Sequence, residues 1–335
     1  MWNDTQKSII DYIKQVDRPV TPNELFEKLK KSRVTIQANL KILLKEGFMQ
    51  KQGASPRVFY VFANQEKDTT ETHEDFFENP ENKNLKDLIE ENFLLLTSDG
   101  QEILGIKGFI VWCKERNYDV VIKATEYKKY FDEYYSFKIN GLIDATSKIK
   151  SSFNTDKTYL DNLYYLYPYS FPVFGKTKIA EWLFHAKQTQ NKKLMERIFD
   201  IILSEIKRII LDKKPEAISF VPPTVPREVQ FMKELEKRLN LNLPIIKIEK
   251  IKTPILIQQK SLKEISDRVK NAENTMVVRS ENMNYKKVLI IDDFTGSGST
   301  LNVLAGKMKR QKIAQGVMGL TITGSMKGFD VIREV

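Results

Sequence analysis

The feature that most constrains this 335-residue chain lies near its C-terminus, where an aliphatic run leads into two acids and a small-residue loop. The four aliphatic residues from Val288 to Ile291 predict a strand buried on both faces, as in a parallel sheet covered by helices. Asp292 and Asp293 follow at once. After the loop, an amphipathic pattern from Leu301 to Lys309 predicts a helix. The sequence therefore predicts an α/β unit whose strand carries polar chemistry at its end.

The loop between the acids and the predicted helix has the composition of a phosphate-binding site. Glycine lets the backbone approach a ligand, hydroxyl groups add hydrogen-bond donors, and the amides at a helix N-terminus favour negative charge. The candidate phosphate-binding residues are Thr295, Gly296, Ser297, Gly298, Ser299 and Thr300.

Two other nucleotide-binding motifs do not fit this region. A strand that ends in two acids also suits a P-loop NTPase, which needs GxxxxGK[ST] elsewhere in the chain. The only GKT, which begins at Gly175, lacks the first glycine and follows bulky residues. A dinucleotide site needs its acid about twenty residues after the glycines, whereas here the acids come first.

The acids Asp292 and Asp293 and the loop after them resemble the motif by which type I phosphoribosyltransferases bind 5-phosphoribosyl 1-pyrophosphate (PRPP). The resemblance implies a Rossmann-like α/β fold with a parallel sheet. It also implies that the acids hold the ribose hydroxyls, that the loop amides hold the 5-phosphate, and that Asp292 or Asp293 contacts Mg²⁺ directly or through water. Residues 294–296 depart from the family, which more often has two aliphatic residues and then Thr or Ala.

The chain before this motif resembles the ComF subfamily of phosphoribosyltransferases. The match is weak at Tyr169, Phe174, Trp182 and Lys187, and better from a predicted strand at Ile218 onward. It implies a second strand from Pro244 to Ile251 and a further strand from Gly316 to Thr323.

The same resemblance implies roles for residues between these strands. They are a pyrophosphate loop with Pro223, Thr224 and Arg227, and a mobile segment with Gln259 and Lys260. Arg227 and Arg268 are the candidate catalytic partners of the departing pyrophosphate, because a guanidinium group matches phosphate oxygens. For Arg268 an ion pair with Glu264 at i−4 is the alternative.

The first sixty residues predict three helices and a hairpin. Apolar spacing predicts a helix from Ser8 to Val16, a capping box at Thr21 starts a second, and a third follows Ser32 and ends at Gly47. This arrangement resembles the winged helix-turn-helix domains of bacterial regulators, whose third helix enters the major groove. The resemblance gives Arg33, Thr35, Gln37 and Lys41 as candidate groove residues, and Lys51 and Arg57 as candidate phosphate contacts. Packing against a partner protein is the alternative.

Composition divides the rest of the chain. We expect a winged-helix domain over 1–63, a solvated acidic linker over 64–84, a helical middle region over 85–157 and a phosphoribosyltransferase-like domain over 158–335. The middle region holds aromatic residues that fit either a stacking surface for bases or a core. They are Trp112, Tyr127, Tyr130, Tyr134 and Tyr135.

Charge and residue counts limit the class of protein. A net charge of +10 favours an anionic partner, either nucleic acid or phosphorylated small molecules. No apolar run approaches the roughly 18 residues that span a bilayer, and the start lacks the regions of a signal peptide, so we expect a cytoplasmic protein without a membrane partner. The lone Cys113 excludes an internal disulfide, and two histidines make no Cys/His cluster for zinc.

Three functions remain open at this level. The first, which the retention of Arg227, Gln259 and Arg268 favours, is an enzyme that transfers phosphoribosyl from PRPP or a related ribosyl phosphate while its winged helix binds nucleic acid. The second is a non-catalytic, PRPP-sensing transcription regulator, because the bacterial purine operon repressor joins the same two kinds of domain. The third is an antiphage effector controlled by a reverse transcriptase and its DNA–RNA product, because the chain is similar to retron-associated winged-helix and phosphoribosyltransferase proteins. The acceptor and any homo-oligomer stay open.

Overall fold

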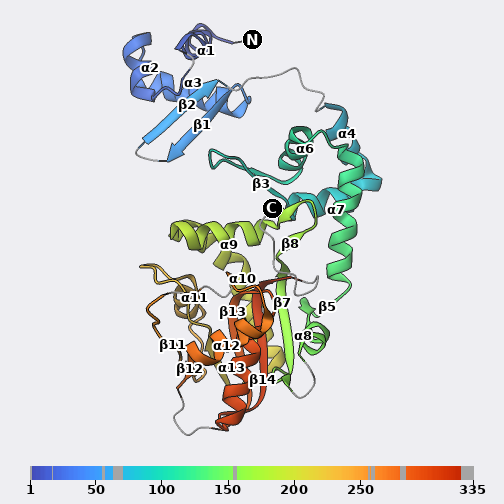
Figure 1. Ribbon diagram of the computed structural model, residues 1–335. Coiled ribbons are helices and arrows are strands. Elements are labelled where there is room, and N and C mark those ends of the chain that lie inside the picture. The colour runs from blue at the N-terminus through green and yellow to red at the C-terminus, as the bar shows by residue number, and fades with distance from the viewer. Residues whose placement is uncertain are drawn as a thin grey trace. The chain divides into compact units, whose positions relative to one another are not determined.

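The computed structural model describes residues 2–16, 18–54, 57–62, 71–153, 157–255, 257, 261–279 and 284–325. They divide into two compact units, one within Met1–Pro80 and Leu96–Ile103 and the other within Glu81–Leu95 and Leu104–Val335 (Figure 1). In this described part of the chain, no helix combines the length and the apolar character needed to cross a membrane.

The first unit begins with three helices and a hairpin, as predicted. These are α1 (Asp4–Val16), α2 (Pro22–Leu29), α3 (Arg33–Lys45) and the antiparallel strands β1 (Met49–Ala54) and β2 (Arg57–Phe62). The Thr21 hydroxyl accepts a hydrogen bond from Glu24 N at 3.2 Å, and the Ser32 hydroxyl accepts one from Thr35 N at 3.1 Å. Both helix starts therefore carry side-chain caps, of which the sequence predicts the one at Thr21. The likeness to winged-helix domains stays a prediction.

The range 64–84 differs from the expected linker. It contains α4 (Glu71–Glu78), the 3₁₀ helix η1 (Pro80–Asn82) and the start of α5 (Lys83–Asn92), while residues 64–70 lie outside the described residues. The physical reason is Phe77, which is 1% exposed and contacts the Phe76 ring edge-on. An acidic stretch that carries two such rings can bury an apolar side chain and fold as helix.

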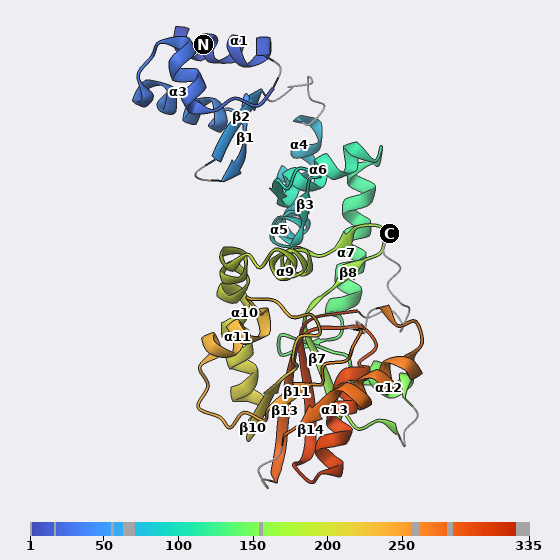
Figure 2. The same ribbon diagram turned by 60° about the vertical axis from the view of Figure 1, so that its left-hand side comes forward.

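The second unit contains a mostly parallel sheet, so the chain is an α/β protein as predicted. Four parallel strands stand side by side in the order β10 (Ala217–Phe220), β13 (Tyr285–Thr295), β14 (Ala314–Gly324) and β7 (Asn162–Pro168). Figure 2 labels the four parallel strands, and two short antiparallel strands, β6 (Leu142–Asp144) and β5 (Lys138–Ile139), continue the sheet beyond β7.

Helices cover both faces of this sheet. One layer consists of α9 (Lys178–Thr189), α10 (Lys192–Lys213) and α11 (Phe231–Leu239). The other consists of α8 (Thr146–Ser152), α12 (Ile265–Thr275) and α13 (Ser299–Arg310). Leu289 and Ile291 of β13 pack with the first layer, and Val288 and Ile290 pack with the second. All four are fully buried, as predicted, and each such side chain stabilises the fold by about 1.5–3 kcal/mol relative to exposure.

The middle region does not form a body of its own at the expected boundary near residue 157. Its strand β6 pairs with β7 in one sheet, and its ring Trp112 stacks on Phe174 at a centroid distance of 5.1 Å. Strand pairing between segments far apart in sequence leaves no local signal, so composition does not indicate this pairing. The remaining elements here are β3 (Leu94–Leu96), β4 (Glu102–Leu104), α6 (Gly105–Glu115), α7 (Val120–Tyr135), β8 (Ser170–Phe171) and β9 (Gly175–Lys176).

The aromatic residues of the middle region mostly serve as core. Trp112, Tyr127 and Tyr134 are each at most 5% exposed. Cys113, which follows Trp112 in the sequence, is fully buried. Tyr127 and Phe171 meet edge-on at 5.2 Å. These buried rings are therefore unavailable for stacking on bases.

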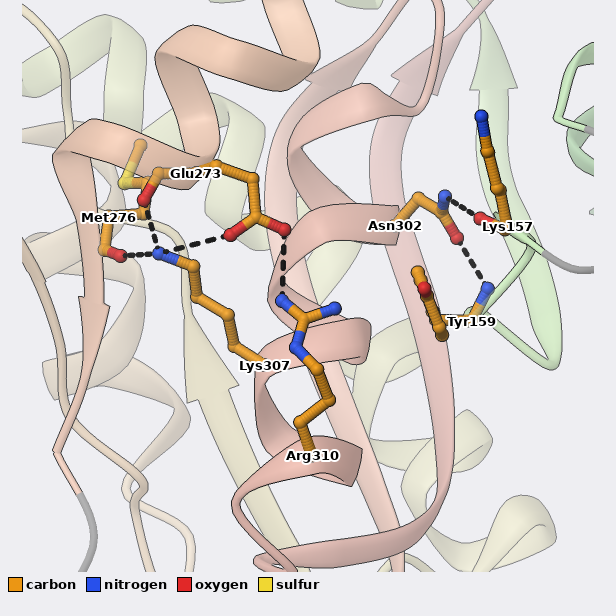
Figure 3. A network of polar contacts seen from close by, with 7 residues as sticks. All are labelled: Lys157, Tyr159, Glu273, Met276, Asn302, Lys307 and Arg310. Carbon is orange, nitrogen blue, oxygen red and sulfur yellow. Dashed lines mark hydrogen bonds and ion pairs between the residues drawn. The ribbon is translucent and has the colours of Figure 1, made fainter.

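Helix α13 is held on two sides by polar contacts (Figure 3). The Asn302 Oδ1 atom accepts hydrogen bonds from Tyr159 N at 2.8 Å and Leu160 N at 3.1 Å, and its Nδ2 donates to Lys157 O. On the other side, Lys307 Nζ donates to the carbonyls of Glu273 and Met276. These contacts tie α13 to the segment before β7 and to the end of α12. Because the small-residue loop opens α13, they also position that loop.

We predict that Asn302→Ala lowers the free energy of unfolding by about 2–4 kcal/mol, because two backbone N–H groups and one carbonyl lose their partner. Urea unfolding of the full chain measures the loss. The control is Asn191→Ala, which removes a single cap bond to Leu194 N and costs about 1 kcal/mol. A loss at residue 302 no larger than that of the control would contradict the anchoring role of Asn302.

Candidate functional site

The carboxyl ends of the four parallel strands meet at one edge of the sheet. Phe220 is in register with Ile291, so the chain leaves β10 about 4.8 Å, one strand spacing, from the acids of β13. Thr295 is in register with Gly324, and Gly324 with Pro168. In open α/β sheets, ligands bind at this edge. The topology therefore brings the acids, the small-residue loop and residues 222–230 to one place.

Asp292 and Asp293, the acid pair, lie within β13 shortly before its end at Thr295. Consecutive strand residues point to opposite faces. Asp293 points to the α9 side, where Lys187 Nζ forms an ion pair with its Oδ2 atom. Asp292 accepts a hydrogen bond from Asp293 N at 2.8 Å and, among the described residues, has no ion pair. Both residues keep partial exposure, and the Asp293 side chain is 16% exposed, whereas the Asp292 carboxyl group is the more buried of the two.

The two acids of the pair have different electrostatic surroundings. Burial first, and then the neighbouring charge of Asp293, raise the pKa of Asp292 well above its usual range, while the Lys187 ammonium group acts in the other direction. Asp292 therefore favours its protonated form more than an ordinary aspartate does, whereas Asp293 faces a cation directly.

The small-residue loop is more covered than the sequence suggests. Thr295, Ser297 and Ser299 are at most 6% exposed, whereas Gly296 and Thr300 are partly accessible. The hydroxyl oxygens of Ser297 and Ser299 lie 2.8 Å apart and bond to each other. Access for a phosphate group is therefore from the side of Gly296 and Thr300.

Gly298 allows the chain to turn in this loop and allows the Ile149 side chain to pack against it. Its φ of 73° lies in the left-handed region, and an added Cβ would come within 2.2 Å of Ile149 Cδ1 on α8. Gly298 is also the N-cap of α13 and has no side chain, so the first amide of the helix, Ser299 N, donates to Ser297 Oγ at 3.4 Å instead. The amides of Thr300 and Leu301 follow in the same turn and are the donors that a phosphate would use.

The residues predicted for the pyrophosphate loop lie beside the acid pair. Arg227 Nη2 donates to Gln188 Oε1 at 3.2 Å, and Gln188 directly follows Lys187 on α9. The Thr224 hydroxyl accepts a hydrogen bond from Lys250 Nζ at 3.2 Å, and Pro223 is half-buried. The structure thus links Arg227 and the acid pair to neighbouring residues of one helix end.

The predicted mobile segment is described only in part. Gln259 and Lys260 lie outside the described residues. Arg268 on α12 is 9% exposed, its Nε donates to Leu262 O at 2.8 Å, and burial lowers its pKa. This contact orders the chain that enters α12 and directs Arg268 to backbone. Its predicted role at pyrophosphate stays a prediction.

The strand expected from Pro244 to Ile251 divides into two parts. Ile245 bridges to Ile218 beside β10, and then β11 (Ile248–Lys250) pairs antiparallel with β12 (Met276–Val278). The reason is that β10 ends at Phe220, so residues past this point find their partner in β12 instead.

Sequence reasoning missed two cations at this edge. Lys187 was matched to a subfamily pattern without a role, and it pairs with an aspartate 106 positions away. Lys250 belongs to no motif in the sequence, and its ammonium group donates a hydrogen bond to the Thr224 hydroxyl. No local pattern signals either contact, because each joins segments that only the fold brings together.

A cavity of about 190 Å³ lies at the carboxyl end of β7. Aromatic and aliphatic side chains line most of it, together with charged groups from α5 and α9. Its lining residues are Glu91, Asn92, Phe131, Tyr167, Pro168, Phe171, Thr177, Lys178, Ile179 and Ile201. None of the predicted site residues is among them, so the acid pair does not open into this cavity.

The candidate nucleic-acid residues of the first unit divide into two groups. Arg33, Gln37 and Lys41 are exposed and recur every four residues of α3, so they form one stripe. Thr35 is half-buried, and its hydroxyl lies 2.8 Å from the Ser32 hydroxyl in the helix cap. Lys51 on β1 is exposed. The Arg57 side chain lies outside the described residues.

The acid pair fits a magnesium ion that arrives with its substrate. Among the described residues, no group of three or more His, Cys, Asp or Glu side chains is placed to hold a metal. Mg²⁺ commonly binds one or two carboxylates and takes its other oxygens from water and substrate phosphates. Asp292 and Asp293 would supply those carboxylates.

No protein-family model and no curated protein matches the chain. Among solved structures, it is similar to a hypoxanthine phosphoribosyltransferase from Staphylococcus aureus, with 14% identity, a TM-score of 0.22, and 37% of this chain and 61% of that chain covered. It is also similar to an adenine phosphoribosyltransferase from Leishmania tarentolae, with 13% identity, a TM-score of 0.24, and 47% and 83% covered. The chain thus spans less than two thirds of the first of these enzymes. Neither likeness bears on its activity.

We predict that Asp292→Asn stabilises the protein by about 1–2 kcal/mol at pH 7, because the amide carries no charge beside Asp293. An aspartate whose pKa rises on folding binds its proton more tightly in the folded state. Its stabilising contribution is therefore largest below the ordinary value of 3.8 and falls as the pH rises toward the raised value. Urea unfolding at pH 7 and pH 4 should show the gain shrinking at the lower pH.

The matched control is Asp293→Asn, which breaks the ion pair with Lys187. This variant should bring no gain in stability at pH 7. Equal stabilisation by the two substitutions would contradict the asymmetry of the acid pair.

Proposed function

We propose that the second unit binds PRPP or a related ribosyl phosphate and transfers its phosphoribosyl group with release of pyrophosphate. One observation carries this proposal. The acid pair, the loop that opens α13 and residues 222–230 stand together at one carboxyl edge of the sheet. A ribosyl phosphate presents hydroxyls, a phosphate and a pyrophosphate, and this edge offers carboxyl groups, helix amides and cations to match them.

The chemistry follows from these groups. The acceptor's nucleophile forms a bond to the anomeric carbon, the bond from that carbon to the pyrophosphate oxygen breaks, and pyrophosphate leaves with the electron pair. Positive charge develops on the ribose ring, and carboxylates of the acid pair beside it favour the transition state over the ground state. Arg227 faces the departing pyrophosphate. Bound Mg²⁺ would neutralise part of the phosphate charge.

We further propose that the first unit binds nucleic acid. The exposed stripe of Arg33, Gln37 and Lys41 supports this, because cations contact phosphates and side-chain amides read base edges. Residues 1–62 contain eleven Lys and Arg against six Asp and Glu, which also favours an anionic partner.

Two alternatives use the same ligand site. A non-catalytic regulator would bind PRPP through the acid pair and the small-residue loop and would not need Arg227. The covered state of Ser297 and Ser299 favours this alternative, because ligand binding would have to change the packing of the loop. An antiphage effector would add control by a reverse transcriptase and its DNA–RNA product. The pairing of Arg227 with the helix end that holds Asp293 favours the enzyme.

The first test is release of pyrophosphate from PRPP in the presence of Mg²⁺ and a panel of nucleobases. We expect release with at least one base, and a loss of at least about 100-fold in Asp292→Asn with Asp293→Asn, because both carboxylates act on the developing charge. Asp200→Asn, at an exposed position of α10, is the control and should keep the full rate. PRPP binding without release would favour the regulator. The absence of both binding and release would contradict the proposal.

The second test concerns the first unit. We expect Arg33→Ala with Lys41→Ala to weaken binding of duplex DNA or RNA, measured by fluorescence anisotropy, and to reduce the slope of log affinity against log salt by about 2. Lys7→Ala, at an exposed position of α1, should leave that slope almost unchanged. An unaltered slope in the double variant would show that the α3 stripe does not contact phosphates.

A further inference from the structure

We propose that Lys187 is a specificity-determining residue of this sheet edge. Without a ligand its ammonium group forms the ion pair with Asp293, and when PRPP binds the ammonium group leaves Asp293 and contacts the pyrophosphate. This inference rests on the proposed function and assigns a role to a residue that the PRPP-binding motif does not include. Its consequence is that the site discriminates PRPP from a sugar phosphate that lacks pyrophosphate.

The position of Lys187 allows an exchange of partners. It lies two residues before the end of α9, and its Nζ contacts Asp293 Oδ2. The Lys187 side chain is 32% exposed and the Asp293 side chain is 16% exposed. The ammonium group is the more exposed partner of this ion pair, so it can reorient toward solvent or a ligand, and the mostly buried Asp293 carboxylate then needs a ribose hydroxyl in its place.

The same helix end holds the loop that follows β10. Gln188 Oε1 accepts a hydrogen bond from Arg227 Nη2 at 3.2 Å, and Gln190 Oε1 accepts one from Val229 N at 2.8 Å. Lys187, Gln188 and the C-cap residue Gln190 at the end of α9 thus reach Asp293 on one strand and two points of residues 222–230. A movement of Lys187 at the acid pair therefore acts on a helix end that also contacts residues 222–230.

Cations from three elements stand at this edge of the sheet, in residues 222–230 or one contact away from them. Lys187 comes from α9, Arg227 belongs to the loop itself, and Lys250 comes from β11, where its ammonium group binds Thr224. Burial lowers the pKa of Lys250, which indicates that its charge is poorly solvated. A group with several negative charges, such as pyrophosphate, suits this surplus of cations better than a neutral ligand does.

Binding of ribose at Asp293 requires a change at Lys187. A ribose hydroxyl that donates to Asp293 Oδ2 competes with the ammonium group already there. A donor with pyrophosphate gives Lys187 a new anionic partner beside Arg227. Ribose 5-phosphate gives it none at that place and must break the ion pair without replacement. The ion pair therefore weakens the binding of ribose 5-phosphate more than that of PRPP.

The experiment compares PRPP with ribose 5-phosphate by isothermal titration calorimetry at fixed Mg²⁺, using the full chain. In Lys187→Met we expect PRPP affinity to fall by about tenfold and ribose 5-phosphate affinity to rise by about three- to tenfold, because Asp293 is freed while a pyrophosphate contact is lost. Arg227→Met is the matched control. It should lose PRPP affinity and leave ribose 5-phosphate affinity unchanged. Lys187→Arg, which keeps the charge, should restore most of the discrimination.

The outcomes separate this inference from the proposed function. If the unaltered protein binds neither ligand, the proposed function fails. If it binds PRPP and Lys187→Met does not raise ribose 5-phosphate affinity, the role of Lys187 is overturned while the proposed function stands. Urea unfolding of each variant checks that lost binding does not come from lost folding.

Discussion

The structure of the second unit depends on a strand that is buried on both faces until it reaches its acids. From Val288 to Ile291, β13 lies between two helical layers, where an unpaired charge would be costly. Charged groups stand on this strand only outside the covered run, at Lys286 and Lys287 before it and at Asp292 and Asp293 after it. The hydrophobic packing that stabilises the sheet thus also decides where its polar chemistry lies, and α13 anchors the loop that follows.

The position of the acid pair lowers the stability of the folded protein. Asp292 sits where burial disfavours its charged form, and only Asp293 has a cationic partner among the described residues. Such a group lowers stability at neutral pH, which is common where side chains serve a ligand rather than the fold. The network of Asn302, Lys307 and Glu273 acts in the other direction, because it fixes α13 and with it the start of the loop.

The sequence predicted the helices, strands and caps whose formation depends on residues close together in the chain. The aliphatic run of β13, the helix after its loop and the cap at Thr21 follow from period, composition and side-chain chemistry. The acid pair and its loop were also visible as a candidate site. Gly298 could be recognised as a turn residue, but not the Ile149 side chain that packs against it from 149 positions along the chain.

Contacts between distant segments were not predictable. The pairing of Ile143 with Tyr165 joins the middle region to the sheet, and the ion pair of Lys187 with Asp293 joins a helix end to the acids. The residues around each position do not indicate its partner, because the two partners are far apart in the sequence and only the fold brings them together. The helix α4 forms in an acidic range because burial of the Phe77 side chain stabilises it despite the surrounding acidic residues.

The most direct test of this account is a crystal structure of the chain soaked with PRPP and Mg²⁺. We expect density for the sugar phosphate along β13, with its 5-phosphate at the amides that open α13 near Gly296 and Thr300, and with the Lys187 ammonium group moved from Asp293 toward pyrophosphate. Density for PRPP at another place, or none at saturating PRPP, would contradict the claim that this edge of the sheet holds a ribosyl phosphate.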